Sequence, residues 1–483
     1  DENVFDIQQG VAIGVFVKVA GISGTAKVHY ADLWGSREDK YTWLAERTTT
    51  TTEWKELAPS KPFYLFAPQD TDLRTEYELG WKVTEAMPVN VLGFQTHRDH
   101  FAIDVDEKRL RARILDLRGT SRSDDDLRSE YDLHDNLDWK LSEARKLLRA
   151  DGNWDDHFVR CLYRPFDWRA CYFSGSVMDR PRRELLDHVA HQENLCLGLG
   201  RQGIAVNDPQ WSLVAASREP MDANIFRRGG INVFPLYLYP AARTELKLSL
   251  PFEPEAGVTE EARRPNLAPA FIADMAARLS LTFISDGFGD LVGTFGPEDV
   301  FRYVYAILHS HTYRTRFAEF LKLDFPRVPL TSDLVLFREL WLLGDTLVRT
   351  HLLTPPGPAR RTIHYPISGD NIVDAGHPKY SRPGEPDRET RKPVETGRVY
   401  ISGGDSQSGK RAQYFEGISP MMWEFHIGGY QIGEKWLKDR RGQMLSYQDI
   451  EHYEQIVGAL GETIRLMEEV DATIDNRGGW PLS

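Results

Sequence analysis

The chain has 483 residues, 41% of them hydrophobic, and a net charge of −13, which allows two to four domains and argues against nucleic-acid binding through bulk positive charge. No run of about eighteen apolar residues occurs, which excludes a membrane-spanning helix. The three cysteines, Cys161, Cys171 and Cys196, form no CxxC pair and favour reduced thiols in the cytoplasm rather than a metal site.

The first residues predict a β-hairpin. Residues 11–18 are an apolar run of strand length, and residues 26–30 form a second β-like run after two glycines. Because two strands alone are marginally stable in water, we expect their sheet to lie mostly upstream of residue 1. We therefore assign residues 1–45 to this strand hairpin and residues 46–90 to a connector.

A strand-rich part is predicted over residues 91–295. Apolar residues at helical spacing predict a helix over residues 106–117 and another that ends near Asp151. Between residues 158 and 240 the pattern changes to short aromatic and β-branched runs broken by Gly, Pro and Asn, which is typical of strands.

The second half of the chain is predicted to begin with a helical hairpin over residues 296–354, interrupted near Ser310. Residues 355–400 are rich in Pro and Gly without periodicity, so we expect a loop or insertion there. Residues 401–483 are predicted to hold strands and helices, the last helix starting at Ser446. The predicted fold class is therefore mixed α+β.

One glycine-rich segment resembles a nucleotide-binding loop. Residues Gly198-Leu199-Gly200-Arg201-Gln202-Gly203 satisfy the GxGxxG pattern, in which glycines let a helix N-terminus approach a pyrophosphate. No helix and no βαβ unit is predicted around them. A nucleotide-binding enzyme acting through this loop is therefore kept as an alternative function.

A polar turn is the first candidate for contact with DNA. Residues 96–99 place a hydroxyl, an imidazole, a guanidinium and a carboxylate on one turn between strands. This mixture of donors and acceptors can read base edges in the major groove. The alternative is a structural turn in which Asp99 caps the backbone and pairs with Arg98.

Arginines interleaved with aromatics and proline are the second candidate. They occur at residues 163–169 and 180–183, and Arg binds phosphate with two parallel hydrogen bonds. The predicted phosphate contacts are Arg164, Arg169, Arg180, Arg182 and Arg183. The alternative is that these side chains stack on their own aromatics or pair with Asp167 or Asp179.

Six short segments, in this order, resemble the single-polypeptide (type ISP) restriction-modification enzymes. They are residues 3–11 with 32–35 and 40–41, Thr96-His97-Arg98-Asp99, Tyr163-Arg164-Pro165-Phe166-Asp167, Asp179-Arg180-Pro181-Arg182, Phe325-Pro326-Arg327-Val328-Pro329 and Ile427-Gly428-Gly429-Tyr430-Gln431. The resemblance implies that residues 1–45 are the last strands of a Rossmann-like adenine methyltransferase domain. A target-recognition region would follow.

The resemblance further implies sequence-specific binding to duplex DNA, at sites where the upstream domain methylates adenine with S-adenosylmethionine. In the family a strand ends at the positions of Arg201 and Gln202, which makes both residues candidates for base readout together with Thr96, Arg98 and Asp99. We expect no catalytic residue, cofactor or metal in this chain. Its partners would be duplex DNA and the upstream methyltransferase domain.

The net charge of −13 leaves a further alternative open, a protein-interaction scaffold that docks a separate motor subunit. Acidic residues concentrate at residues 124–138, 253–261 and 449–475, whereas Lys and Arg cluster at 180–183 and 435–441. A basic cleft in an acidic protein can still attract DNA. DNA binding is therefore the favoured function.

Overall fold

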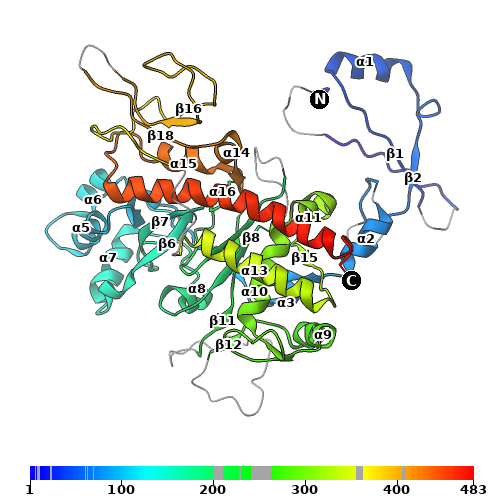
Figure 1. Cartoon of the computed structure of the whole chain (residues 1–483), viewed down its shortest axis with the longest axis horizontal. Coiled ribbons are helices and arrows are strands. Elements are labelled where there is room, and N and C mark those ends of the chain that lie inside the picture. The colour runs from blue at the N-terminus through cyan, green and yellow to red at the C-terminus, as the bar shows by residue number, and fades with distance from the viewer. Residues whose placement is uncertain are drawn as a thin grey trace. The chain divides into compact units, whose positions relative to one another are not determined.

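The computed structural model describes residues 1–5, 7, 11–21, 24, 26–59, 61, 64–68, 70–200, 210–227, 230–240, 263–354, 363–404 and 409–482. Its internal contacts divide the chain into two units, residues 1–75 and 76–483. Most of the secondary structure belongs to the second unit (Figure 1). None of the helices in the described ranges is long and apolar enough to cross a membrane.

The first unit is built from helix α1 (Arg37–Glu46) and the antiparallel pair β1 (Val28–Tyr30) and β2 (Lys55–Leu57). Ser36 caps α1, because its side chain accepts a hydrogen bond from the backbone N–H of Asp39 at 3.2 Å. Such a cap satisfies one of the free N–H groups at the start of a helix.

The predicted hairpin between residues 11–18 and 26–30 is wrong. Strand β1 pairs with β2, and residues 11–19 form no strand. Val15, Phe16 and Val17 are 82%, 82% and 81% exposed. Among the described residues this apolar run has neither a partner strand nor a core to pack on, so its β propensity alone does not produce pairing.

The range predicted as a connector, residues 46–90, contains regular elements besides β2. They are α2 (Thr71–Glu78), β3 (Trp81–Lys82) and α3 (Val83–Ala86). Strand β3 pairs with β15 (Arg327–Val328), so this segment is tied to a part of the chain far away in sequence.

Two antiparallel sheets form the centre of the second unit. The four-stranded sheet has the order β4-β10-β8-β9, and the three-stranded sheet has the order β5-β7-β6. The strands are β4 (Val91–Leu92), β5 (Ile103–Asp104), β6 (Phe158–Arg164), β7 (Asp167–Tyr172), β8 (Cys196–Leu199), β9 (Val214–Ser217) and β10 (Asn232–Pro235). Strands β6 to β10 lie in the range predicted to be rich in strands.

Helices accompany these sheets in the first part of the unit. They are α4 (Asp99–Ala102), α5 (Glu107–Arg118), α6 (Asp124–Tyr131), α7 (Leu141–Ala150), the 3-10 helix η1 (Trp154–His157) and α8 (Arg183–Ala190). Helices α5 and α7 agree with the two helices predicted from apolar spacing. Asp106 caps α5, and its side chain accepts from the N–H of Lys108 at 2.9 Å.

Short strand pairs complete the mixed α+β fold of the second unit. They join β11 (Tyr237–Leu238) to β12 (Arg264–Pro265), β13 (Thr282–Phe283) to β14 (Thr294–Phe295), and β19 (His426–Ile427) to β20 (Tyr430–Gln431). The fold thus consists of many small sheets, and the mixed fold class is confirmed.

A group of helices packs against these sheets. They are α9 (Pro269–Leu279), α10 (Pro297–His309), α11 (His311–Arg316), α12 (Ala318–Leu321), α13 (Leu334–His351) and α16 (Tyr447–Asn476). Helices α10 and α13 pack closely together. Helix α10 ends at His309, and Ser310 then caps α11, which explains the predicted interruption.

The region 363–418 carries a three-stranded antiparallel sheet, β16-β17-β18, and is called the β16–β18 lobe below. Its strands are β16 (Lys379–Ser381), β17 (Arg398–Tyr400) and β18 (Tyr414–Glu416). The described part of residues 355–400, which the sequence predicts to be a loop or insertion, thus holds β16 and β17. Strands of three residues show no periodicity in sequence, and their pairing is decided by contacts across the lobe.

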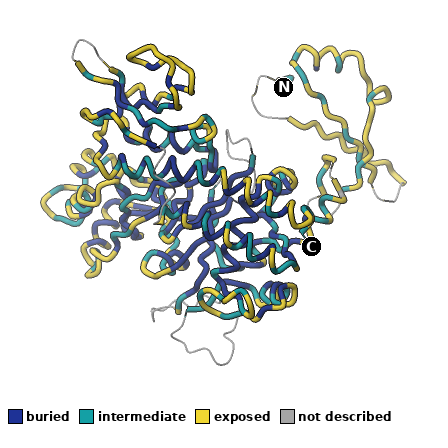
Figure 2. Tube along the Cα trace, in the orientation of Figure 1, coloured by how far each residue is buried: buried dark blue, intermediate teal, exposed yellow. Residues whose placement is uncertain are grey.

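The core of the second unit runs along the sheets and the inner faces of α10, α13 and α16, which Figure 2 shows as a continuous buried region. In Figure 1, α13 lies below the long helix α16, and α14 (Pro420–Trp423) and α15 (Ile432–Lys438) lie above it. Helix α16 packs on all four of the helices α10, α13, α14 and α15. It therefore links the helical group to the segment that follows the lobe.

Candidate nucleic-acid interface

The polar turn at residues 96–99 lies between β4 and α4 and is tightly bonded internally. His97 has a left-handed backbone, with φ of 53°. The hydroxyl of Thr96 donates to the carboxylate of Asp99 and accepts from the backbone N–H of Arg98 at 3.1 Å. These bonds hold the turn in one conformation.

Arg98 is the central buried side chain of this turn. It is 4% exposed, and its guanidinium lies 2.6 Å from Asp179 and 3.9 Å from the ring centre of Trp139. It also donates to the backbone carbonyls of Thr96 and Val177, both at 2.9 Å. The contacts of the Arg98 guanidinium are thus made within the protein. The alternative of an Arg98–Asp99 pair is corrected here, because the partner of Arg98 is Asp179.

Asp179 collects further donors at the same place. His97 lies 2.6 Å from its carboxylate, and Asn136 donates to it at 2.8 Å. Burial would raise the pKa of Asp179, but hydrogen bonds from His97, Arg98 and Asn136 outweigh burial and lower the pKa. Asp179 therefore remains a carboxylate that anchors the turn.

The members of the turn differ in what they present to solvent. Thr96 and Arg98 are buried, whereas the side chains of His97 and Asp99 are 54% and 36% exposed. Base readout by Thr96, Arg98 and Asp99 stays a prediction. The sequence reasoning missed His97 as an exposed member, although the residue stands in the same motif.

The second polar network surrounds the hairpin of β6 and β7. The chain turns at Pro165 and Phe166, and Phe166 has a left-handed backbone with φ of 61°. Arg164, whose side chain is 11% exposed, lies 3.0 Å from Asp222 and stacks 3.8 Å above the ring of Tyr163. Burial raises the pKa of Asp222 to about 6, in spite of the opposing guanidinium of Arg164.

Asp167 holds two arginines on the other side of the hairpin turn. Its carboxylate lies 2.6 Å from Arg169 and 2.9 Å from Arg440, and the residue is 3% exposed. Burial would raise the pKa of Asp167, but the charges of Arg440 and Arg169 outweigh it and lower the pKa. Arg164 and Arg169 thus stack on Tyr163 and pair with carboxylates, as the alternative interpretation of these arginines predicts.

The two networks are joined through Asp99. Its carboxylate accepts from the hydroxyl of Tyr163 at 3.0 Å and from Thr96. A small cleft of about 10 Å³, room for about one water, opens beside the hairpin and is lined by Arg164, Pro165, Asp167, Tyr430, Ile432, Lys435, Trp436 and Asp439. Turn, hairpin and cleft form one continuous polar region.

The predicted phosphate contacts near α8 are more exposed. Arg180 lies 2.9 Å from Asp138, and Arg183 lies 3.1 Å from Asp187. Arg182 precedes α8 with a left-handed φ of 56°, forms no ion pair among the described residues, and its Nε lacks a hydrogen-bond partner there. Arg201 and Gln202 lie outside the described residues.

The glycine-rich segment does not have the surroundings of a nucleotide loop in its described part. Gly198 lies in β8, which pairs antiparallel with β9 and β10 rather than within a βαβ unit. A Cβ at Gly198 would lie 2.4 Å from Ile231, so close packing explains this glycine. Residues 201–203 of the pattern lie outside the described ranges.

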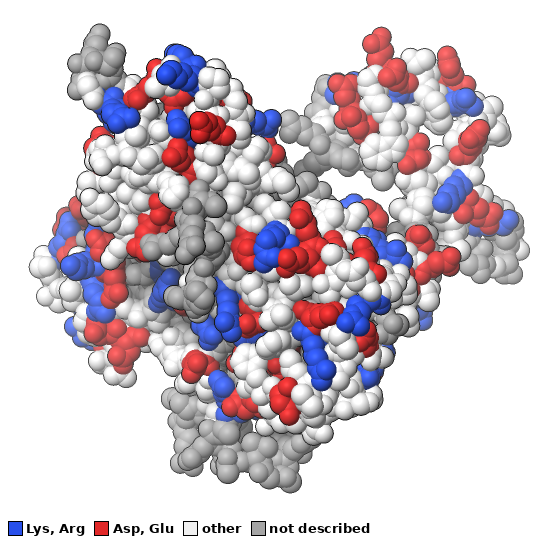
Figure 3. Space-filling model, in the orientation of Figure 1, with Lys and Arg blue, Asp and Glu red and all other residues white. Residues whose placement is uncertain are grey.

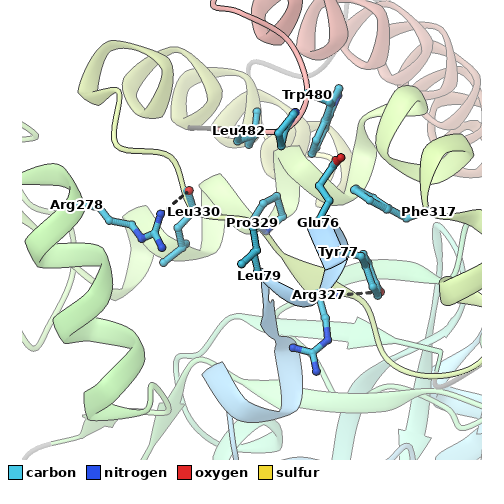
Figure 4. A pocket seen from close by; sticks show the side chains of 11 residues that line it. Glu76, Tyr77, Leu79, Arg278, Phe317, Arg327, Pro329, Leu330, Trp480 and Leu482 are labelled. Atoms are coloured by element: carbon cyan, nitrogen blue, oxygen red, sulfur yellow. Dashed lines mark hydrogen bonds between the residues drawn. The ribbon is translucent and has the colours of Figure 1, made fainter. Parts of the chain in front are cut away.

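A separate pocket of about 110 Å³ lies where the last residues pass α2 (Figure 4). The ring centres of Trp480 and Phe317 are 5.8 Å apart, and Tyr77 accepts from the N–H of Arg327 at 3.1 Å. Nucleotide-sized ligands occupy pockets of about 300 Å³ or more, so this pocket is too small for one. No group of three potential metal ligands occurs in the ranges that the structure describes.

Comparison with known proteins gives a family and a fold. The model of the Type ISP C-terminal specificity domain matches residues 85–469. A search of curated proteins found no match.

Three solved structures resemble the chain. A nuclease-deletion mutant of the Type ISP restriction-modification enzyme LlaGI, in complex with a DNA substrate mimic, has 17% identity, a TM-score of 0.57 and coverage of 93% of this chain and 39% of its own. The DrdV–DNA complex has 16% identity, a TM-score of 0.60 and coverage of 92% and 43%. The ATP-dependent Type ISP enzyme LlaBIII bound to DNA has 16% identity, a TM-score of 0.57 and coverage of 87% and 25%.

At these identities the structural likeness shows the fold alone, and the chain spans less than half the length of each of the three proteins. The specificity-domain model, in contrast, matches well over half of the chain. The resemblance to the Type ISP restriction-modification enzymes is confirmed. The chain belongs to the family of Type ISP C-terminal specificity domains.

Proposed function

We propose that this chain selects the DNA target of a Type ISP restriction-modification enzyme by binding duplex DNA sequence-specifically. The observation that carries the proposal is the match of residues 85–469 to a domain described by its specificity. The similar LlaGI and LlaBIII structures are complexes with a DNA substrate mimic and with DNA, which supports duplex DNA as the ligand. The methyl donor, S-adenosylmethionine, would be bound by a methyltransferase domain of the parent protein.

Base readout is proposed for the exposed side of the polar turn. His97 and Asp99 would reach base edges, with one donor or acceptor role each, while Thr96 and Arg98 hold the turn through their internal bonds. Arg201 and Gln202 stay predicted readout residues. This division follows from exposure, because the guanidinium of Arg98 is buried and paired with a carboxylate, whereas His97 and Asp99 reach the surface.

Among the predicted phosphate contacts, Arg182 is the best-supported candidate. It has no ion pair within the described residues, whereas the side chains of Arg164 and Arg169 are only 11% and 16% exposed and pair with carboxylates. Arg180 and Arg183 form exposed pairs, which contribute at most about 1 kcal/mol and can open to bind phosphate.

The test is competition binding between a duplex carrying the preferred site and a random duplex, measured across a salt series. If about six phosphates are contacted, log affinity falls against log salt with a slope near −5. Preference for one duplex supports sequence-specific binding. Absence of DNA binding at low salt would overturn the proposal and favour the scaffold that docks a motor subunit.

A further inference from the structure

The β16–β18 lobe differs in charge from the rest of the chain. Residues 363–418 contain eight Lys and Arg and eight Asp and Glu, so the whole net charge of −13 lies outside the lobe. In Figure 3 Lys and Arg side chains stand on the outer end of this lobe, with acidic side chains between them. A Lys or Arg side chain of the lobe is free to bind another molecule only if no nearby carboxylate pairs with it.

The loop between β16 and β17 is built around one buried carboxylate. Asp387 accepts from the N–H of Thr390 at 2.6 Å and from Arg398 and the hydroxyl of Tyr400, both at 2.8 Å. Burial would raise its pKa, but the hydrogen bonds from Thr390 and Tyr400 outweigh burial and lower the pKa. Asp387 is therefore an ionised anchor of the loop and does not face the loop's outer surface.

The backbone closes the same loop into a narrow tip. The N–H of Asp387 donates to the carbonyl of Lys392 at 2.7 Å, and the N–H of Val394 donates to the carbonyl of Glu385 at 2.9 Å. Residues 388–392 thus form a tip on two bonded arms. Arg388, Arg391 and Lys392 are all exposed on it.

Three other acidic side chains of the lobe are engaged in ion pairs. Glu416 pairs with Arg398 at 3.1 Å, and Asp370 and Asp374 pair with Lys410 at 3.1 and 3.4 Å. Five exposed cations of the described lobe then have no ion pair among the described residues. They are Lys379, Arg388, Arg391, Lys392 and Arg411.

Tyr400 brings two of these cations together. Lys379 lies opposite Tyr400 in the pairing of β16 with β17, and the guanidinium of Arg388 lies 5.2 Å from the Tyr400 ring centre. The ring of Tyr414, on the neighbouring strand β18, is 5.1 Å from that of Tyr400. Two of the free cations, Lys379 and Arg388, therefore lie near Tyr400 on the central strand of this small sheet.

We propose that the β16–β18 lobe binds the phosphate backbone of duplex DNA through the tip cations Arg388, Arg391 and Lys392. The inference rests on the proposed function and adds a contact surface to it. Exposed cations without a carboxylate partner release counterions when they meet phosphate, whereas a paired cation must first leave its carboxylate. An acidic protein partner would need the same cations, and the family of the chain favours DNA.

The experiment compares the triple variant Arg388→Ala, Arg391→Ala, Lys392→Ala with a charge-matched control in the full chain. The control is Lys146→Ala, Lys322→Ala, Arg465→Ala, which removes three exposed cations that each pair with a nearby carboxylate. The tip variant should lower the magnitude of the salt slope by about three, and weaken binding to the preferred and random duplexes by the same factor. The control should keep the wild-type slope.

Two further variants guard against misfolding. Arg388→Lys with Arg391→Lys retains the charges and should retain the slope. If the triple variant melts below the assay temperature, Arg391→Gly replaces it, because Arg391 has a φ of 60° that glycine adopts freely, and the slope should fall by about one.

The outcomes separate the two proposals. Wild-type protein that binds no DNA overturns the proposed function itself. Wild-type binding together with a wild-type slope in the folded tip variant overturns the role of the lobe and leaves DNA binding intact. If the tip variant loses binding to polyglutamate but keeps wild-type binding to DNA, the lobe is assigned to an acidic protein partner instead.

Discussion

The guanidinium of Arg98 and the carboxylate of Asp179 lie 2.6 Å apart, and their side chains are 4% and 0% exposed. The pair connects the turn after β4 to the segment before α8, 81 residues further along the chain. A buried charge pair of this kind costs stability when one partner is lost, because the remaining charge stays desolvated. The polar turn at residues 96–99 is thus also part of the fold.

Arg98→Ala should therefore lower the free energy of unfolding by about 3 kcal/mol, as buried ion pairs do when one partner is removed. Urea denaturation measures the change. Arg109→Ala is the control, since Arg109 pairs with Asp104 at a surface position where its side chain is 58% exposed, and about 1 kcal/mol or less is expected. Equal, small losses in both variants would contradict a structural role for Arg98.

His97→Ala should lower the unfolding free energy less than Arg98→Ala does, since its side chain is 54% exposed, while affecting recognition. If the turn reads bases, the variant loses about 1–3 kcal/mol of preference for the specific duplex over a random duplex. Competition binding with both duplexes measures this difference. Equal losses on both duplexes would remove the turn from the readout surface.

Arg164 and Asp222 should show a coupling free energy in a double-mutant cycle. Arg164→Met and Asp222→Asn each break the buried pair, so the double variant should be more stable than the sum of the single losses predicts, by more than about 1 kcal/mol. Chemical denaturation of the four proteins provides the cycle. Additive losses would mean that the contact at 3.0 Å contributes no interaction energy.

Stability should fall as the pH drops below about 6.5, because of the buried histidines between α10 and α13. His351 bonds to Tyr305 at 2.6 Å and to Thr463 at 2.9 Å, and burial, with the nearby charge of Arg314, lowers its pKa to about 3. In the unfolded chain His takes up its proton near pH 6.5, so the unfolded state binds more protons between about pH 3 and 6.5.

The loss from His351 amounts to at most about 1.4 kcal/mol per pH unit in that window. His351→Gln should flatten the pH profile of the unfolding free energy, measured by denaturation between pH 4.5 and 7.5. His309, whose pKa burial also lowers, contributes in the same direction and remains in the variant. A profile that is as steep in the variant as in the wild type would contradict the assignment to His351.

Gly344→Ala should destabilise the protein by about 1–3 kcal/mol, since overpacking of a close helix contact carries that cost. A Cβ at Gly344 would lie 2.0 Å from the backbone carbonyl oxygen of Arg302, so α10 and α13 would have to separate. Gly461→Ala in α16 is the control, because its Cβ would meet only the flexible end of Met422. Thermal melting should separate the two variants clearly.

Much of the helical part could be predicted from the sequence, because helix signals are local. The start of α16 at Ser446 and the break at Ser310 are caps within three residues of the groups that they bind. Where pairing is distant the predictions failed. Residues 11–18 have β propensity without a partner strand among the described residues, and β16 lies inside a range that was predicted only as a loop or insertion.

The sequence by itself determined the family and the positions of the polar motifs, because the order of the short segments can be recognised without knowing which residues contact one another. Only the tertiary structure decided which arginines are neutralised. Arg164 meets a carboxylate 58 residues away, and Asp167 meets Arg440 across 273 residues. Ion pairing depends on the path of the chain through space, so a basic motif alone does not show whether its charge remains available for DNA.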